Sequence, residues 1–408
     1  MKAQRFTAIL FIFIIGVLCL VSAPAVPRIL TYRDTDFQGV LGDRGQGSRL
    51  DSGLSKEFPA LTFWMGVYGE VNKTLGVRYI PDQEVGVAKL DGGQLSYGID
   101  RLGDKRLDEY VENTATLKER LESRGIPLVY VQVPFKIGME GGLEKGGADY
   151  SDYNCNRLIS ALTSNDVEVL DLRREMKGRM SPGKMFFRTD HHWRPEAALM
   201  AAGILGERIH SNLGLDYKES AFDSGSYNEK IYEKSYLGAL GKKTGATYGG
   251  TDDFTVLTPE KSPDFRVTWR RDGKTFSRRG KFADSLVDSR IVTRGDLYHR
   301  VSYDAYMNGR GAVATVVNEG FKDRGKHPGE DWQAGGPRGR ILLVGDSYSW
   351  CMVPFLAMNY RQVTAVDMRD FTEMSLWEYL KNNTFDCVVI AYNPASLEGR
   401  NFSFFSRK

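Results

Sequence analysis

The sequence predicts an α/β fold, a three-layer α/β/α sandwich around a mostly parallel sheet, with an irregular β-rich insertion. Short apolar runs alternate with amphipathic helical segments, which is typical of a parallel sheet covered on both faces. The composition, with 41% apolar and 26% charged residues, is that of a globular protein. A length of 408 residues suffices for one large domain or two ordinary ones.

Residues 1–25 are set apart from the fold. Lys2 and Arg5 precede an apolar and small-residue run from Phe6 to Ala25, a pattern that is typical of an export signal. Ala23-Pro24-Ala25 has the form of a cleavage site, whereas the run from Phe6 to Ala23 is long enough for a short membrane span. A cleaved signal peptide and a retained membrane anchor therefore both stay open. Either one places the rest of the chain outside the cytoplasmic membrane. An exported chain without a disulfide framework is more typical of a bacterial envelope than of a eukaryotic secretory route, so we expect a bacterial envelope.

An N-terminal extension packing on the core is expected for residues 26–105, with a helix from Glu57 to Leu75. The first part of the catalytic domain is expected in residues 106–213, where apolar periodicity predicts the helices and strands. Gly125 marks the end of one helix and Pro195 the start of another. In chain order we expect a helix at Leu107–Arg124, a strand at Pro127–Pro134, a helix at Asp152–Leu162, strands at Val167–Leu172 and Met185–Arg188, and a helix at Pro195–Leu213.

A β-rich insertion is expected for residues 214–338, because glycine, serine and charge dominate there. Residues Phe265 to Phe276 predict a hairpin that turns at Asp272-Gly273. Its basic run indicates either an ordinary solvated face or a surface for a polyanionic glycan. The seven cations of this run are Arg266, Arg270, Arg271, Lys274, Arg278, Arg279 and Lys281.

The second part of the catalytic domain is expected in residues 339–408, where the α/β pattern returns. The predicted strands are Arg340–Val344, Val363–Val366 and Phe385–Ala391, and the predicted helices are Tyr348–Met358 and Met374–Lys381.

Charge and cysteine content exclude several functional classes. The net charge of +3, from 55 basic and 52 acidic residues, gives no case for a nucleic-acid binder. Four cysteines are too few for a disulfide scaffold. Cys351 and Cys387 lie in apolar stretches and are interpreted as buried small hydrophobic residues. No cofactor is expected.

Two motifs carry chemistry. Thr189-Asp190-His191-His192-Trp193 precedes the helix that begins at Pro195, and it holds two of the five histidines. Leu342 to Tyr348 is a buried strand that ends in Gly-Asp-Ser and turns into a helix. That turn lifts the hydroxyl of Ser347 to the sheet edge, beside helix N–H groups that stabilise an oxyanion.

The spacing of the first motif selects a partner for this serine. A serine nucleophile needs a base, and the base needs an orienting carboxylate. Because residues two apart in an extended segment share a face, we expect Asp190 and His192 to face Ser347 together, with His191 turned away.

Two simpler interpretations stand beside the triad. Gly-Asp-Ser could be an ordinary helix N-cap, with Asp346 or Ser347 satisfying the helix N–H groups. Asp-His-His could belong to a metal site, which needs a third and a fourth ligand. His210, His299 and His327 show no ligand spacing, so no metal is predicted.

Asp190-His191-His192-Trp193 resembles the signature of the DHHW family, which is similar to the alginate O-acetyltransferases of bacterial envelopes within the SGNH hydrolase superfamily. The resemblance runs from Leu107 to Gly399. In those acetyltransferases, as in this chain, D-x-H precedes the serine, the reverse of ordinary SGNH esterases. Further segments that resemble the family are Val133–Lys136, Tyr303–Gly309, Asp346–Ser349, Val353–Leu356 and Asp367–Arg369.

The resemblance implies that Ser347 is the nucleophile, His192 the base and Asp190 its orienting partner, and that Arg369 lines the site. Further candidates for substrate binding or the oxyanion are Gly345, Asn393, Tyr348 and Lys136. The simpler interpretations are a strand-end turn residue for Asn393, an exposed strand-end lysine for Lys136 and a packing role for Tyr348.

These residues predict an envelope O-acyltransferase or esterase that acts on acetyl groups of a surface polysaccharide. Because acetyl-CoA is cytoplasmic, transfer outside the membrane implies a membrane-bound acyltransferase as the acetyl donor. No nucleic-acid partner is expected. The alternative is a non-catalytic glycan-binding or polysaccharide-assembly protein that retains the fold.

Overall fold

The computed structural model describes Gly16 and residues 61–82, 85–140, 148–271, 273–309, 311–321 and 339–407. The expected export segment therefore lies outside the described residues, apart from Gly16. No helix in the described part of the chain is long and apolar enough to span a membrane.

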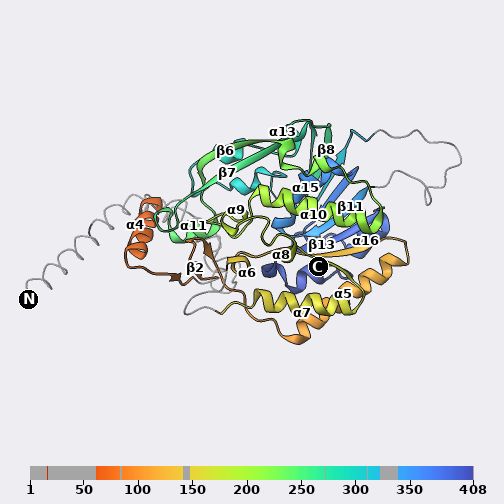
Figure 1. The fold of residues 1–408 in the computed structure, drawn as a ribbon, viewed down its shortest axis with the longest axis horizontal. Helices are drawn as coiled ribbons and strands as arrows, with labels where there is room; N and C mark the ends of the chain where they lie inside the picture. Colours follow the sequence, from red (N-terminus) through yellow and green to blue (C-terminus); the bar gives the residue numbers. More distant parts are fainter. Residues whose placement is uncertain are drawn as a thin grey trace, which may run out of the picture.

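An eight-stranded sheet forms the centre of the molecule (Figure 1). Its parallel part has the strand order β5-β4-β13-β11-β12, and the antiparallel strands β10-β8-β9 extend it on one side. The parallel strands are β4 (Leu128–Gln132), β5 (Glu168–Asp171), β11 (Arg340–Gly345), β12 (Gln362–Val366) and β13 (Cys387–Tyr392). The antiparallel strands are β8 (Phe265–Arg271), β9 (Lys274–Gly280) and β10 (Val313–Asn318). The expected fold class is confirmed.

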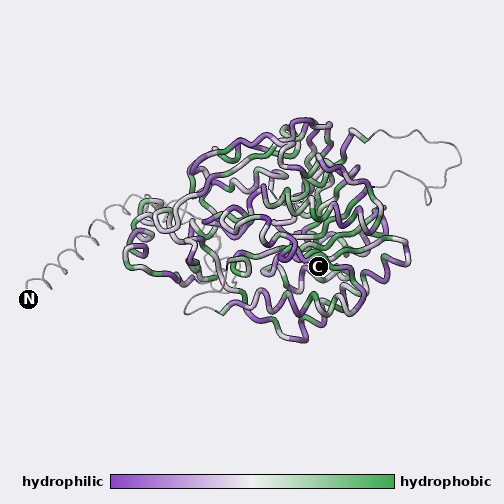
Figure 2. The backbone as a smooth tube through the Cα atoms, viewed as in Figure 1, coloured by the Kyte–Doolittle hydropathy of each residue, from purple (hydrophilic) through white to green (hydrophobic). Residues whose placement is uncertain are grey.

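Helices cover both faces of this sheet, because successive side chains of its buried strands point to opposite sides. In β11, Ile341 and Leu343 face one core, and Leu342 and Val344 face the other. Figure 2 shows the hydrophobic residues gathered along the central strands. The first core is covered by α10 (Pro195–Leu213) and α15 (Ser347–Asn359), and the second by α5 (Asp104–Glu122), α7 (Ser151–Ser164) and α16 (Leu376–Asn382).

The helix expected at Pro195–Leu213 is confirmed at both ends. Pro195 occupies its first position, and Gly214 takes up the left-handed conformation after its last (φ 64°). The strand expected at Met185–Arg188 is wrong. Met185 ends the short helix α9 (Pro182–Met185). Beyond it the backbone makes single hydrogen bonds, from the Phe187 N–H to the His192 carbonyl and from the Leu95 N–H to the Arg188 carbonyl, and an isolated bridge between Phe186 and Trp193, but no strand ladder.

The described part of residues 214–338 is β-rich, as expected, and its strands are shared between two sheets. β6 (Tyr227–Tyr236) and β7 (Asp252–Pro259) form a separate pair, whereas β8, β9 and β10 join the central sheet. Between β6 and β7 in the chain lie α11 (Ala239–Thr244) and α12 (Ala246–Gly249).

The described N-terminal residues pack against these two helices through α4 (Leu61–Thr74). The three-stranded sheet of β1 (Tyr79–Ile80), β2 (Val87–Lys89) and β3 (Leu95–Ser96) follows. The remaining short helices are α6 (Lys136–Glu140), α8 (Leu172–Glu175), α13 (Phe282–Ser285), α14 (Arg290–Thr293) and 3-10 turns at Glu219–Ala221, Ser224–Ser226, Ser302–Ala305, Pro394–Ser396 and Gly399–Phe402.

Candidate active site

The candidate residues gather at one edge of the sheet, where its parallel strands end. Ser347 follows β11, Arg369 follows β12, and Asn393 follows β13. β10 runs antiparallel to both β12 and β8, so the carboxyl end of β8 reaches the same edge. This brings Arg270 and Arg271 of the basic hairpin to the site, while Arg279 and Lys281 of the same run pair with surface carboxylates.

The Gly-Asp-Ser turn presents Ser347 as the first residue of α15. Asp346 is the N-cap, and its Oδ1 accepts a hydrogen bond from the backbone N–H of Tyr348 at 2.9 Å. Its Oδ2 accepts from the backbone N and the Nδ2 of Asn393 at 2.8 and 2.7 Å, which ties the cap to the end of β13. The helix is therefore capped by Asp346, and the Ser347 hydroxyl is not used as a cap. The backbone N–H of Ser347, at a first helical position, has no acceptor within its own helix.

His192 connects that hydroxyl to Asp190. Its Nε2 lies 2.7 Å from Ser347 Oγ, and its Nδ1 lies 2.7 Å from Asp190 Oδ1. Because an ionised carboxylate can only accept, Nδ1 carries the ring proton and Nε2 accepts from the serine hydroxyl. The structure thus places the three side chains in the order that a serine triad requires.

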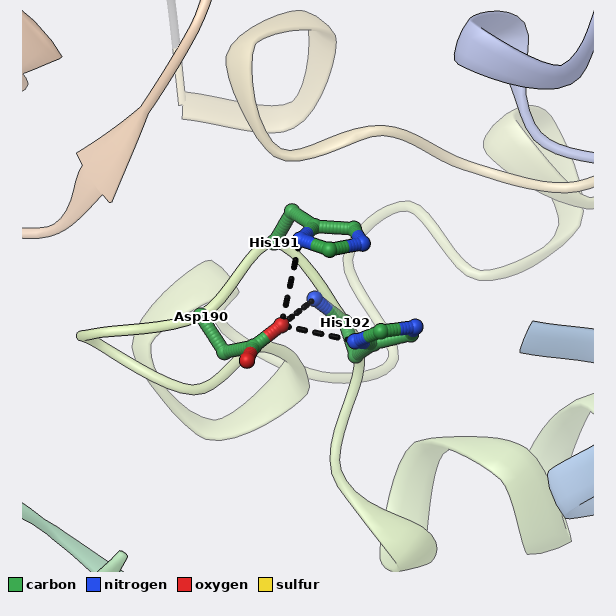
Figure 3. A group of neighbouring side chains, drawn as sticks. All are labelled: Asp190, His191 and His192. Carbon is green, nitrogen blue, oxygen red and sulfur yellow. Dashed lines mark hydrogen bonds and ion pairs between the residues drawn. The ribbon is translucent and has the colours of Figure 1, made fainter. Parts of the chain in front are cut away.

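Asp190 is almost wholly buried, and both of its oxygens are hydrogen bonded. Figure 3 shows the contacts that one of them, Oδ1, makes with His191 and His192. Oδ1 also accepts from the backbone N–H of His192 at 2.9 Å. Oδ2 accepts from the hydroxyl of Tyr236 at 2.7 Å and from the N–H of Ala239 at 2.9 Å. Burial alone would raise the pKa of Asp190, but the nearby His192 and His191 and the hydrogen bonds from His192 hold it well below its usual range.

His191 does not turn away, so the expectation from an extended chain is wrong. The Asp190 carboxylate accepts the N–H two residues on and bends the chain, which ends the simple alternation of side chains. The His191 ring lies 4.0 Å from that of His192 and lines the same cavity. Burial, and then the charge of His192, lower the pKa of His191 to about 3. The ring is therefore neutral at neutral pH, and its 3.2 Å approach to Asp190 is not an ion pair.

Lys136 is wholly buried behind this loop, so the interpretation as an exposed lysine is wrong. Its Nζ donates to the carbonyl oxygens of Leu95 at 2.7 Å, Phe187 at 2.6 Å and Asp190. One ammonium group thus joins β3 to the two ends of the segment that leads to His192.

Gly238, the N-cap of α11, permits the close approach of the insertion to Asp190. A Cβ at this position would lie 2.3 Å from Asp190 Cβ and 2.5 Å from its Oδ2. Only a glycine therefore lets the following N–H, that of Ala239, reach the carboxylate.

Gly345 and Tyr348 lie behind the reacting atoms. A Cβ on Gly345 would lie 2.1 Å from Ser349 Oγ and 2.6 Å from the Ala391 oxygen, so glycine lets β11, β13 and α15 meet. Tyr348 is wholly buried, and its hydroxyl donates to the His191 carbonyl. Of the further candidates for substrate binding, Arg369 lines the cavity, whereas Gly345, Tyr348, Asn393 and Lys136 do not.

A cavity of about 1020 Å³ opens over Ser347 and His192. Tyr303 forms part of its wall and stacks on the His192 ring with centroids 4.1 Å apart. Arg369 is held there by two hydrogen bonds to the buried Asp367, at 3.0 and 2.8 Å. Charged side chains of both signs line the wall: Lys242, Arg270, Arg271, Arg300, Arg369, Asp304, Asp370 and Glu373.

Several of these residues were missed by the sequence analysis. Tyr236, Gly238 and Arg300 come from the aperiodic insertion, where no local pattern marks them. Tyr303 was within reach, because it lies in a segment that carries the family resemblance.

The site favours a proton relay over metal binding. Asp190, His191 and His192 are the one group of metal-type ligands in the described part of the chain, with ligand atoms within 4.8 Å of one another. Both ring nitrogens of His192 and both oxygens of Asp190 already have hydrogen-bond partners, so a metal would have to displace them.

The fold and this site together define a protein with the SGNH hydrolase-like fold. Residues 97–271 match the family model described as SGNH hydrolase-like domain, acetyltransferase AlgX. That range holds Asp190 and His192, whereas Ser347 lies beyond it. A search of curated proteins found no match.

Two solved structures extend the likeness to most of the chain. PatB1 of Bacillus cereus, determined with a sulfonyl adduct, is 18% identical with a TM-score of 0.62, covering 78% of this chain and 100% of that one. A DHHW family protein from Eubacterium siraeum is 17% identical with a TM-score of 0.57, covering 81% and 99%. At these identities the likeness concerns the fold. The resemblance expected from Asp190-His191-His192-Trp193 is confirmed.

Proposed function

We propose that this protein is an O-acyltransferase or esterase of the bacterial cell envelope that transfers or removes acetyl groups on a polysaccharide. One observation carries the proposal: two contacts of 2.7 Å link Asp190 through His192 to Ser347 beneath a large polar cavity. The family model that matches residues 97–271 is described as an acetyltransferase, which supports the same class of reaction.

In the first half-reaction, Ser347 Oγ attacks the carbonyl carbon of an acetyl donor while His192 Nε2 takes the hydroxyl proton. Asp190 holds the imidazole in the required tautomer and stabilises its charge. The carbonyl oxygen becomes an oxyanion beside the N–H of Ser347 at the helix N-terminus. As the tetrahedral intermediate collapses, His192 returns the proton to the leaving oxygen, and Ser347 is left acetylated.

The second half-reaction distinguishes a transferase from an esterase. A sugar hydroxyl attacks the acetyl-serine in one case and water attacks it in the other, with His192 again taking the proton. The size and polarity of the cavity suit a sugar chain, since its walls offer charged side chains of both signs to hydroxyl groups. A membrane-bound acyltransferase is the proposed acetyl donor, because acetyl-CoA is cytoplasmic and the export pattern of residues 1–25 predicts a site outside the cytoplasm.

The test is turnover of 4-nitrophenyl acetate with and without purified envelope polysaccharide. We expect Ser347→Ala to abolish nitrophenolate release, and Ser349→Ala to retain most of it, because the Ser349 hydroxyl donates to the Asp346 carbonyl away from the reacting atoms. Acetylated glycan as a product identifies a transferase, and free acetate alone identifies an esterase. Equal release by Ser347→Ala would contradict the proposal, as would glycan binding without any turnover, which is the behaviour of a non-catalytic binding protein.

A further inference from the structure

Helix α4 carries a row of bare hydrophobic side chains. Phe63, Val67 and Val71 follow one another at four-residue spacing, so they lie on one side of the helix. Leu75 comes directly after the last helical residue and continues the row, since its N–H still bonds to the Val71 carbonyl. Phe63 is 60% exposed, Val71 51% and Leu75 72%. The opposite side of α4 is covered, since a Cβ on Gly69 would meet Thr247 and the Thr247 hydroxyl bonds to the Gly66 carbonyl.

The exposed hydrophobic side chains are concentrated in and directly after α4. Seven of the eleven exposed large hydrophobic residues in the described ranges lie between residues 63 and 85, and the other four are scattered. Single exposed hydrophobic residues are ordinary, whereas a continuous group marks a surface that something covers. We call Phe63, Val67, Tyr68, Val71 and Leu75 the α4 surface.

We propose that the α4 surface lies on a lipid bilayer, with the row from Phe63 to Leu75 inserted among the acyl chains. The composition fits, because the exposed Tyr68 has an apolar ring and a polar tip, as side chains at a membrane interface do.

The chain itself brings a bilayer within reach. Its apolar run ends at Ala25, and residues 26–60 separate that point from Leu61. Even fully extended, a stretch of about 35 residues reaches at most roughly 120 Å. An apolar run retained in the membrane would therefore keep α4 within about that distance of the lipid surface.

The α4 surface is also close to the cavity. α4 packs on α11, whose Lys242 lines the cavity wall and whose Ala239 N–H binds Asp190. A bilayer against the exposed side of α4 is therefore separated from the cavity by α4 and α11. This position would give the site access to an acetyl donor within the membrane, and that benefit rests on the proposed function. The proposed contact with the bilayer does not depend on the proposed function.

The test measures depth with a fluorophore on a single cysteine in the full chain. In a Cys19→Ser background the remaining cysteines, Cys155, Cys351 and Cys387, are buried. Bimane is attached at Val71→Cys or, as the control, at Phe276→Cys on β9, where the native side chain is comparably exposed at 44%. Both proteins are reconstituted in phosphatidylethanolamine–phosphatidylglycerol vesicles that contain brominated acyl chains.

We expect quenching at position 71 to exceed that at position 276 several-fold, and the added pair Phe63→Ser and Leu75→Ser to remove the difference. Equal quenching at the two positions would overturn the proposal. Rapid formation of a disulfide dimer by the unlabelled Val71→Cys protein would also overturn it, because a second copy would then cover the surface. The readout is independent of catalysis, so an inactive enzyme with deep insertion would contradict the proposed function alone.

Discussion

Gly238→Ala is expected to disable the site by displacing one carboxylate. The glycine has φ −72° and ψ 176°, which alanine adopts without strain, so the effect is purely steric. The new Cβ would lie 2.3 Å from Asp190 Cβ, whereas carbon atoms in contact stand about 3.5–4.0 Å apart. The two must therefore separate by more than about 1 Å, which breaks the 2.9 Å bond from Ala239 and shifts the partner of His192.

A displacement of that size at the reacting groups is expected to lower the rate of Ser347 modification about 10²-fold. The overpacked Cβ is expected to lower the free energy of unfolding by about 1–3 kcal/mol. The assay is the rate of Ser347 modification by a fluorophosphonate, followed by intact mass, together with a urea unfolding curve. Gly103→Ala is the matched control, because Gly103 is also an extended helix N-cap (φ −69°, ψ 146°) and has nothing within 4 Å of its would-be Cβ. A Gly238→Ala protein that reacts as fast as the control would refute this account of how Asp190 is held.

Three further predictions follow from the same site. Asp190→Asn is expected to lower the modification rate about 10⁴-fold, because an amide can donate to His192 Nδ1 and so favour the wrong tautomer; a loss under tenfold would contradict it. Lys136→Met leaves three buried carbonyls without their donor and is expected to cost about 2 kcal/mol in urea unfolding, and an unchanged midpoint would contradict it. His191 has a folded pKa of about 3, below the value of about 6.5 in an unfolded chain, so the unfolded state binds the extra proton and stability falls as the pH drops below 6.5. His191→Gln is expected to flatten that loss between pH 6.5 and 4.5 by up to about 1.4 kcal/mol per pH unit, and equal slopes would contradict it.

Local pattern was enough for most of the fold. Pro195 and Gly214 bound α10 at the residues where the sequence placed its ends, because both signals act through the backbone of their own residue. β8 was also visible, since Val267 and Trp269 alternate with exposed Arg266 and Thr268. The sequence did not predict that β8 joins the central sheet, because its pairing with β10 is a contact between segments that lie far apart in the chain.

The sequence predicted those contacts of the candidate site that join residues close together in the chain. It did not predict contacts between residues that are far apart in the chain. The spacing of Asp190 and His192 predicted which imidazole lies between Asp190 and Ser347, whereas His191 follows the bend that the Asp190 carboxylate imposes. Tyr236 and Gly238 reach Asp190 from a distant part of the sequence, through a segment without hydrophobic period. Contacts of this kind arise from tertiary packing and leave no mark in either local sequence.

The central claim is that His192 and Asp190 activate Ser347. The most direct test is the intact mass of the full chain after exposure to a fluorophosphonate probe, with Ser347→Ala as its control. The 2.7 Å contacts that join Ser347 to His192 and His192 to Asp190 predict a single adduct that is absent from Ser347→Ala and strongly slowed in Asp190→Asn. No adduct on the wild-type chain, or one that persists in Ser347→Ala, would contradict it.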